Sequence, residues 1–116
     1  MHDFCHIEIA TTDIAASRTF LGGLFEWEFM EMDANYTLFK PPEGPGGGLE
    51  KVDAPAAAGG IHFYVHVASI EDACGKAPGL GGSVVKEKTE IGGGHGFYAI
   101  LGDPGGTEIG IWEASQ

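Results

Sequence analysis

Three histidines lie in two short segments whose residues alternate between polar and apolar. His6 is in residues 4–10, and His62 and His66 are in residues 61–67. A neutral imidazole binds divalent metals, and an imidazole also accepts or donates protons near neutral pH. Because alternate residues of a strand share one face, each segment predicts a strand whose histidines lie on the polar face. These histidines are the first candidates for a binding or catalytic site.

Two further candidates share the parity of the histidines. Glu8 follows His6 by two residues, and Tyr64 lies between His62 and His66. A carboxylate and an imidazole can transfer protons, so Glu8 and His66 are the predicted catalytic residues, and Tyr64 is a predicted ligand-binding residue. The alternative for each residue is a half-buried polar side chain that lines a pocket without reacting.

The first half of the chain predicts the order β-α-β-β-β. Asp13 has a side chain suited to capping a helix, and the apolar residues after it recur at helical spacing. We expect that helix to end at Gly22-Gly23, since glycine destabilises a helix interior. The predicted elements are a strand at 4–10, a helix at about 13–24, and strands at 27–32, 36–40 and 48–52.

The second half predicts the same order. Ser69 and Asp72 resemble a capping box that opens a short helix, and Ala77-Pro78 ends it. Residues 103–106 (DPGG) predict a tight turn before the last strand. The predicted strands are at 61–67, about 83–88, 97–102 and 107–113.

The two halves repeat each other at one offset of 56 residues. This offset aligns the pairs His6/His62, Asp13/Ser69, Ile14/Ile70 and Leu24/Leu80. The repeat predicts an α+β fold of two tandem βαβββ modules, whose curved mixed sheet surrounds a cup-shaped cleft. We expect one domain over residues 1–116, with modules at 1–54 and 59–116 and a connector at 53–60. The helices should pack on the Ile7/Ile9 and Phe63/Val65 faces, opposite the histidines.

Composition excludes several classes of function. The formal net charge is −11, and such a field repels nucleic acids and anionic membrane surfaces. No apolar run is long enough to span a membrane and no leader is evident, so we expect a cytoplasmic protein. The glycine clusters lack phosphate-binding spacing. Cys5 and Cys74 are expected to be reduced core thiols.

The chain resembles the vicinal oxygen chelate superfamily, which comprises glyoxalases, bleomycin-resistance proteins and extradiol dioxygenases. The resemblance covers essentially the whole chain. The residues that carry it are the opening HIEI at 6–9, the helix DIAASRTFLGGLF at 13–25, HFYVHV at 62–67, and DPGG at 103–106 ahead of GIWE at 110–113.

The resemblance implies a metal site. In metal-dependent members the ligands come from the first and last strands of each module, which here implies His6, His62 and Glu50 as ligands. Gly110 stands at the fourth position and has no side chain to coordinate; matching it to Glu50 requires a four-residue length difference between the modules. Two imidazoles and one carboxylate suit a divalent ion such as Zn, Ni, Mn or Fe.

Two functions follow from the resemblance. The first is a metal-dependent lyase or isomerase acting on a small substrate with adjacent oxygens, or a dioxygenase using the same ligands. The alternative is a metal-free, drug-sequestering protein of the bleomycin-resistance type. Its ligand would lie against apolar walls formed by Tyr64, Phe97 and Trp112 and by the strand that carries Met30 and Met32. In either case the partner is a small molecule, and we expect a homodimer because eight strands leave edges to cover.

Overall fold

A computed structural model describes residues 1–55, 59–104 and 108–116. The chain divides into two compact units. One is Cys5–Phe63, and the other combines Met1–Phe4 with Tyr64–Gln116. Part of the predicted connector and the glycines of the predicted turn at 103–106 lie outside the described residues.

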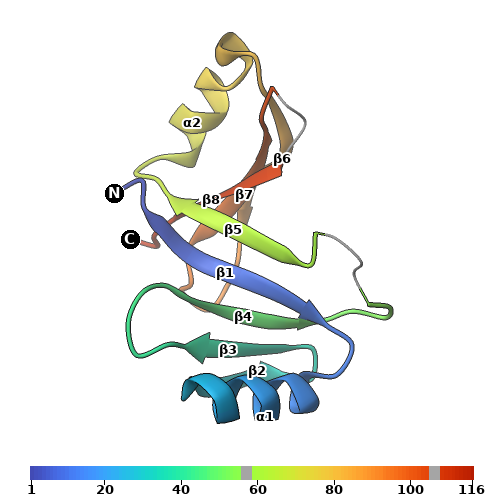
Figure 1. Cartoon of the computed structure of the whole chain (residues 1–116). Helices are drawn as coiled ribbons and strands as arrows, with labels where there is room; N and C mark the ends of the chain where they lie inside the picture. Colours follow the sequence, from blue (N-terminus) through green and yellow to red (C-terminus); the bar gives the residue numbers. More distant parts are fainter. Residues whose placement is uncertain (56–58, 105–107) are drawn as a thin grey trace. The chain divides into compact units, whose positions relative to one another are not determined.

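The elements follow the predicted order in both halves of the chain (Figure 1). The first half contains β1 (Phe4–Thr11), α1 (Ile14–Phe25), β2 (Glu28–Asp33), β3 (Tyr36–Lys40) and β4 (Gly46–Lys51). The second half contains β5 (Ile61–His66), α2 (Ile70–Lys76), a short 3-10 helix η1 (Pro78–Leu80), β6 (Ser83–Glu90), β7 (Phe97–Gly102) and β8 (Glu108–Glu113).

The hydrogen-bonded strand order is β2-β3-β4-β1 in the first half and β5-β8-β7-β6 in the second. In each half, the first and last strands pair in parallel, β1 with β4 and β5 with β8. The remaining pairs within each half are antiparallel. The predicted α+β fold of tandem βαβββ modules is confirmed.

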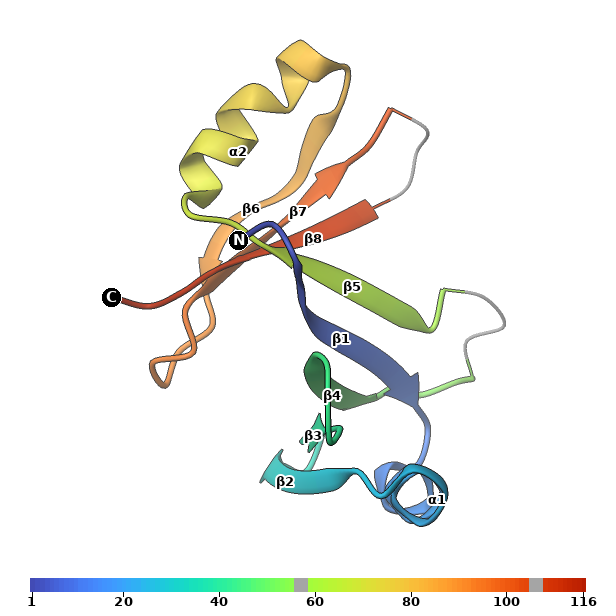
Figure 2. The same ribbon diagram turned by 60° about the vertical axis from the view of Figure 1, so that its left-hand side comes forward.

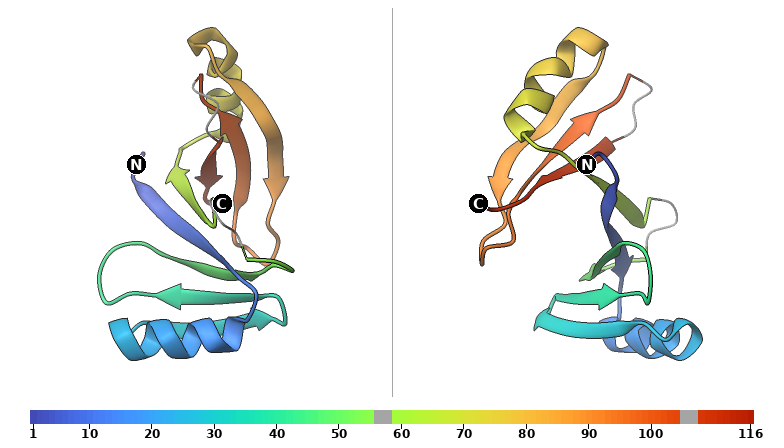
Figure 3. Two further views of the ribbon diagram at one scale, coloured as in Figure 1. Left: turned by 45° about the vertical axis from the view of Figure 1, so that its right-hand side comes forward. Right: turned by 90° about the vertical axis from the view of Figure 1, so that its left-hand side faces the viewer.

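The Cys5–Phe63 unit has its core on the face of the sheet that packs against α1 (Figure 3). Strand registration places Leu49 beside Ile9 and Thr37 on this face. Leu49 has no exposed surface, and Thr37 and Phe39 are also buried. His6 and Glu8 have the opposite parity, so they lie on the face without the helix, as the alternation predicted.

Helix α1 begins as predicted and ends later. The side chain of Asp13 accepts a hydrogen bond from the Ala16 N–H at 3.0 Å, which caps the first turn. The helix passes through Gly22-Gly23 and ends at Phe25, one residue beyond the predicted range of about 13–24, where Glu26 closes it in a left-handed conformation. A Cβ on Gly22 would lie 3.1 Å from the Phe29 ring, so this glycine allows β2 to approach the helix closely.

In the second unit α2 lies against β6, β7 and β8 (Figure 2), and this unit has its own core. Its buried residues are Val67, Ile70, Ala99 and Ile111. Val65 packs against them, which confirms the predicted parity, whereas Phe63 is 48% exposed. Ser69 caps α2 by accepting from the Asp72 N–H, as predicted.

The two cysteines are part-buried thiols. Cys74 packs against the second core, and burial, with the nearby Glu87 carboxylate, raises the pKa of its thiol. Among the described residues, no helix combines the length and apolar character needed to cross a bilayer.

Leu49 should contribute strongly to stability. Leu49→Ala removes buried carbon and leaves a cavity, so the free energy of unfolding should fall by about 2–5 kcal/mol, measured by urea titration. Leu80→Ala is the matched control, because Leu80 is 77% exposed and should change stability little. Equal effects of the two substitutions would contradict this assignment of the core.

Candidate functional site

Three side chains form a hydrogen-bonded chain on the helix-free face of the Cys5–Phe63 unit. The Tyr36 hydroxyl donates to Glu8 Oε2 at 3.0 Å, and His6 Nε2 lies 2.8 Å from the Tyr36 oxygen. The His6 and Glu8 side chains are only 29% and 22% exposed. The structure therefore joins two of the predicted residues through a third, Tyr36, which the sequence reasoning placed only in a strand.

The direction of these bonds is fixed by chemistry. A phenol has one proton, and Tyr36 gives that proton to the carboxylate of Glu8. His6 Nε2 must then be the donor to the Tyr36 oxygen, which defines the protonated nitrogen of its ring. The chain thus runs from imidazole N–H through the phenol to the carboxylate.

Gly48 makes room for this arrangement. It lies between Glu8 on β1 and Leu38 on β3 in the strand register. A Cβ at Gly48 would overlap the Tyr36 ring, so the ring lies directly over this glycine. The signal in the sequence was the run of glycines at 46–48, which marks a strand that another group approaches closely.

The register separates Glu50 from His6. His6 pairs with Gly46, whereas Glu50 pairs with Ala10, four residues farther along β1. At about 3.3 Å per strand residue, the two positions are roughly 13 Å apart along the strands. Ligands of one zinc-like ion lie about 2.0–2.2 Å from it, so these two positions do not fit a shared ion.

The register also corrects the comparison of the two halves. Gly110 pairs with Tyr64, and Gly48 pairs with Glu8, 56 residues before Tyr64. Gly48 is therefore the counterpart of Gly110, and the difference of 110 − 48 = 62 residues exceeds the repeat offset by six rather than the predicted four. Glu50 corresponds instead to Trp112, which pairs with His66.

His62 lies near the start of β5, where the Ala10 N–H donates to the Gly60 carbonyl. Its side chain is exposed. In the part of the chain that the structure describes, no three His, Cys, Asp or Glu side chains are grouped to hold a metal ion. The predicted set of His6, Glu50 and His62 therefore does not fit one ion.

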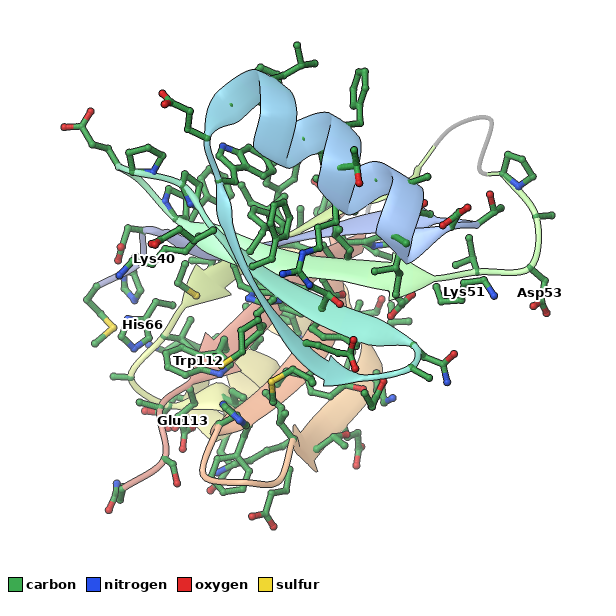
Figure 4. The ribbon with its side chains drawn as sticks, turned by 90° about the horizontal axis from the view of Figure 1, so that it is seen from below. Lys40, Lys51, Asp53, His66, Trp112 and Glu113 are labelled. Carbon is green, nitrogen blue, oxygen red and sulfur yellow. The ribbon has the colours of Figure 1, made fainter. Side chains whose placement is uncertain are left out.

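The second unit carries an aromatic group on its helix-free face. The rings of His66 and Trp112 have centroids 5.0 Å apart and lie side by side (Figure 4). Tyr64 and Tyr98 meet edge to face at 6.3 Å, and Lys86 Nζ lies 4.9 Å from the centre of the Tyr98 ring. Three predicted site residues thus share one face, and Tyr98 and Lys86 are additions from the structure.

Backbone contacts hold Trp112 in place. Its indole N–H donates to the His95 carbonyl at 2.8 Å. The loop that carries His95 turns back at Gly96, whose φ of +86° favours glycine. His95 therefore contributes its backbone to the position of Trp112.

Phe97 does not lie with this aromatic group. It pairs with Glu113, one residue out of phase with the Tyr98–Trp112 pair, so it lies on the opposite face. There Phe97 packs against the core, and Lys88 Nζ lies 4.6 Å from the centre of its ring. The predicted position of Phe97 in the ligand wall is wrong.

An ion-pair network supports the strand end that carries Trp112. Glu113 accepts from the Ile70 N–H at 2.8 Å, and Lys88 bridges Glu113 and Glu71 at 3.3 and 2.9 Å. The Ile70 N–H, followed by Lys88, holds the pKa of Glu113 below its usual range. Glu113 thereby joins β8 to the start of α2.

A family model described as a glyoxalase-like domain matches residues 6–112, most of the chain. The chain belongs to this family. No curated protein matches it. The family and the solved structures that resemble this glyoxalase-like domain fit the vicinal oxygen chelate superfamily, which confirms the resemblance in the sequence.

Three solved structures illustrate the shared fold. A methylmalonyl-CoA epimerase from Mycobacterium tuberculosis has TM-score 0.77 and 15% identity, over 97% of this chain and 88% of that one. A homoprotocatechuate 2,3-dioxygenase from Brevibacterium fuscum has TM-score 0.74 and 21% identity, over 97% of this chain and 36% of that one. A Mn(II)-bound glyoxalase from Novosphingobium aromaticivorans has TM-score 0.74 and 15% identity, over 98% of this chain and 39% of that one. At these identities the likeness shows the fold of this glyoxalase-like domain alone.

The lowered pKa of Glu113 predicts a specific acid sensitivity. A carboxylate with a depressed folded pKa stabilises the fold above its unfolded pKa of about 4.3, and this stabilisation is lost as the pH falls towards the folded value. Glu113→Gln should therefore lower stability at neutral pH and flatten the acid limb of a plot of unfolding free energy against pH. Glu90→Gln, at an exposed carboxylate, should leave the limb unchanged. Parallel curves for wild type and Glu113→Gln would contradict the assignment.

Proposed function

We propose that this glyoxalase-like domain binds a small organic molecule and that no metal takes part. His6, Glu50 and His62 do not form a metal site in this proposal. Trp112, His66 and Tyr64 are the proposed binding residues, and they lie on the helix-free face of the second unit. Planar aromatic rings favour stacked or edge-on contact with a flat ligand. Of the two functions implied by the superfamily resemblance, this is the metal-free alternative.

The observation that carries this proposal is the pair of equivalent glycines, Gly48 and Gly110. The resemblance implied that the last strand of each module supplies a ligand, but both matched positions lack a side chain. The Tyr36 ring lies over Gly48, in the space that a ligating side chain would need. The histidines alone leave too few protein ligands for a catalytic zinc-like site, which commonly has three.

The charge of the protein favours a cationic ligand. The formal net charge of −11 produces a negative potential that attracts organic cations and repels anions. Aromatic faces also bind ammonium groups through their quadrupoles. We therefore propose a planar organic cation as the ligand class.

An enzyme remains the second candidate, with lyase or isomerase chemistry. One observation favours it: Glu8, predicted as catalytic, is held by Tyr36 in an ordered chain that includes His6. Such a chain suits proton transfer. The other predicted catalytic residue, His66, instead lies against Trp112.

The cytoplasmic location and the homodimer stay predictions. Strands β2 and β6 are edge strands of their respective halves, so an edge is available to a second copy. A monomeric mass at micromolar concentration would contradict the dimer.

Metal independence can be tested on the purified protein. We expect no stoichiometric metal by elemental analysis, and no rise in melting temperature on adding Zn, Ni, Mn or Fe(II). A metal bound by the folded state alone would raise the melting temperature. A stoichiometric metal lost in His6→Ala but kept in His2→Ala would overturn the proposal.

The aromatic binding face can be tested with a matched pair of probes. By isothermal titration calorimetry, naphthylmethylammonium should bind more tightly than neutral naphthylmethanol. Trp112→Leu should weaken binding of the cation by about twofold to tenfold, the equivalent of ~0.5–1.5 kcal/mol for an aromatic pair. Trp27→Phe is the control, because the Trp27 ring stacks on the core residue Phe39 at 4.6 Å. Equal losses in the two variants would contradict the assignment.

A further inference from the structure

We propose that the Cys5–Phe63 unit has a second binding site, which takes a free α-amino acid. The site is a cleft between residues 14–18 of α1 and residues 31–37 of β2 and β3, on the face of the sheet that packs against α1 (Figure 3). Its volume is about 240 Å³. Pockets for drug-sized ligands measure roughly 300–1,000 Å³, so this cleft suits a smaller molecule. The proposal does not depend on ligand binding by Trp112.

Arg18 supplies a positive group that is held in place. Its guanidinium lies over the Phe29 ring, 5.5 Å from the ring centre, and its side chain lines the cleft. Arg18 forms no ion pair with any residue that the structure describes. A guanidinium binds a carboxylate through two parallel hydrogen bonds. Arg18 is therefore the proposed anchor for the carboxylate of the ligand.

Three side chains of β2 and β3 supply acceptors for an ammonium group. Glu31 pairs with Thr37 in the strand register, so these two residues are neighbours on one face. Asp33 also lines the cleft, and its Oδ1 accepts from the Asn35 N–H at 2.7 Å, which orients the carboxylate. A primary ammonium has three N–H donors. Two carboxylates and one hydroxyl match these donors in number.

Thr37 is the observation that points to a ligand. It lines the cleft although its side chain is only 2% exposed. Its hydroxyl has no hydrogen-bond partner among residues 1–55, 59–104 and 108–116. A polar group that is withdrawn from water without a partner costs free energy, and valine suits a buried strand position at least as well. We infer that another molecule completes the hydrogen bonding of Thr37.

The spacing and the charge favour a zwitterion. Phe29, which lies under Arg18, precedes Glu31 by two residues, or roughly 7 Å along β2. An α-amino acid carries its ammonium and carboxylate on one carbon, so it spans such a gap with a hydrogen bond at each end. It also has no net charge. The negative potential of a protein with net charge −11 therefore does not repel it as it repels a simple anion.

The remaining walls of the cleft select the side chain of the amino acid and hence the probe. They are apolar and consist of Ile14, Ala15 and Ala34. L-Valine, which has a small aliphatic side chain, is therefore titrated into the isotope-labelled protein and followed by two-dimensional amide NMR. Isobutylamine lacks the carboxylate of valine, and isovalerate lacks its ammonium. We expect L-valine to shift the amide signals of Glu31 and Thr37, and both analogues to bind more weakly.

Substitutions with matched controls assign the charged contacts. Arg18→Gln should weaken L-valine binding by about tenfold or more, as expected for hydrogen bonds to a charged group. Lys76→Gln makes the same change of charge at an exposed residue of α2 and should leave binding unchanged. Glu31→Gln should also weaken binding. Glu28→Gln, on the same strand with the opposite parity, should not.

Thr37→Val separates a binding role from a structural one. The substitution removes the hydroxyl but keeps the shape of the side chain. Because the hydroxyl has no partner among the described residues, its removal should raise the melting temperature of the free protein. It should also weaken L-valine binding by about twofold to tenfold, the usual worth of one hydrogen bond. A lower melting temperature with unchanged binding would contradict the role of Thr37.

The outcomes separate this proposal from ligand binding by the aromatic group. Binding of L-valine that is weakened in Arg18→Gln and kept in Lys76→Gln supports the second site. Unshifted Glu31 and Thr37 amides at millimolar L-valine, or equally tight binding of either analogue, would overturn it. Neither result bears on the aromatic group, because the indole N–H signal of Trp112 reports binding there. If Arg18→Gln does not fold, the pair Glu31→Gln and Glu28→Gln decides in the same way.

Discussion

The absence of side chains at the start of β4, residues 46–48, is the constraint on which the Cys5–Phe63 unit depends. Gly47 lies so close to Ile7 and Phe39 that a Cβ would overlap both, and Gly48 lies under the Tyr36 ring. The two glycines have opposite parity, so one allows close packing beside α1 and the other allows the polar chain on the far face. Larger side chains on β4 would force apart the strands and rings that meet there.

The same glycine position recurs in the second half with a different neighbour. Gly110 is the counterpart of Gly48, and it pairs with Tyr64 where Gly48 pairs with Glu8. One parallel strand pair therefore presents a carboxylate beside its glycine, and the other presents a phenol. Because the backbone register is equivalent, the chemical difference between the halves comes from side chains alone, which is how one fold supports unrelated functions.

The fold could be predicted because its signals are local. Alternation in β1 predicted the face of His6, and Asp13 and Ser69 both cap the helices as their types indicated. The repeat offset extended these predictions to the second half. Helix α1 ends within one residue of the predicted range, but Gly22-Gly23 do not end it: both glycines lie inside the helix, and Gly22 lies against the Phe29 ring.

The candidate site was less predictable because it depends on register between strands that are distant in sequence. A shift of two residues keeps the parity of Glu50, so alternation could not distinguish Glu50 from Gly48 as the counterpart of Gly110. A shift of one residue reverses the face, which is why Phe97 was misplaced while its neighbour Tyr98 lies with Trp112. Tyr36 belongs to no recognisable sequence motif. Only the register of β3 with β4 brings its ring over Gly48 and its hydroxyl to Glu8. Chemistry in this chain therefore depends on strand registration, and a glycine at a position where a ligand was expected indicates which neighbouring side chain occupies the space.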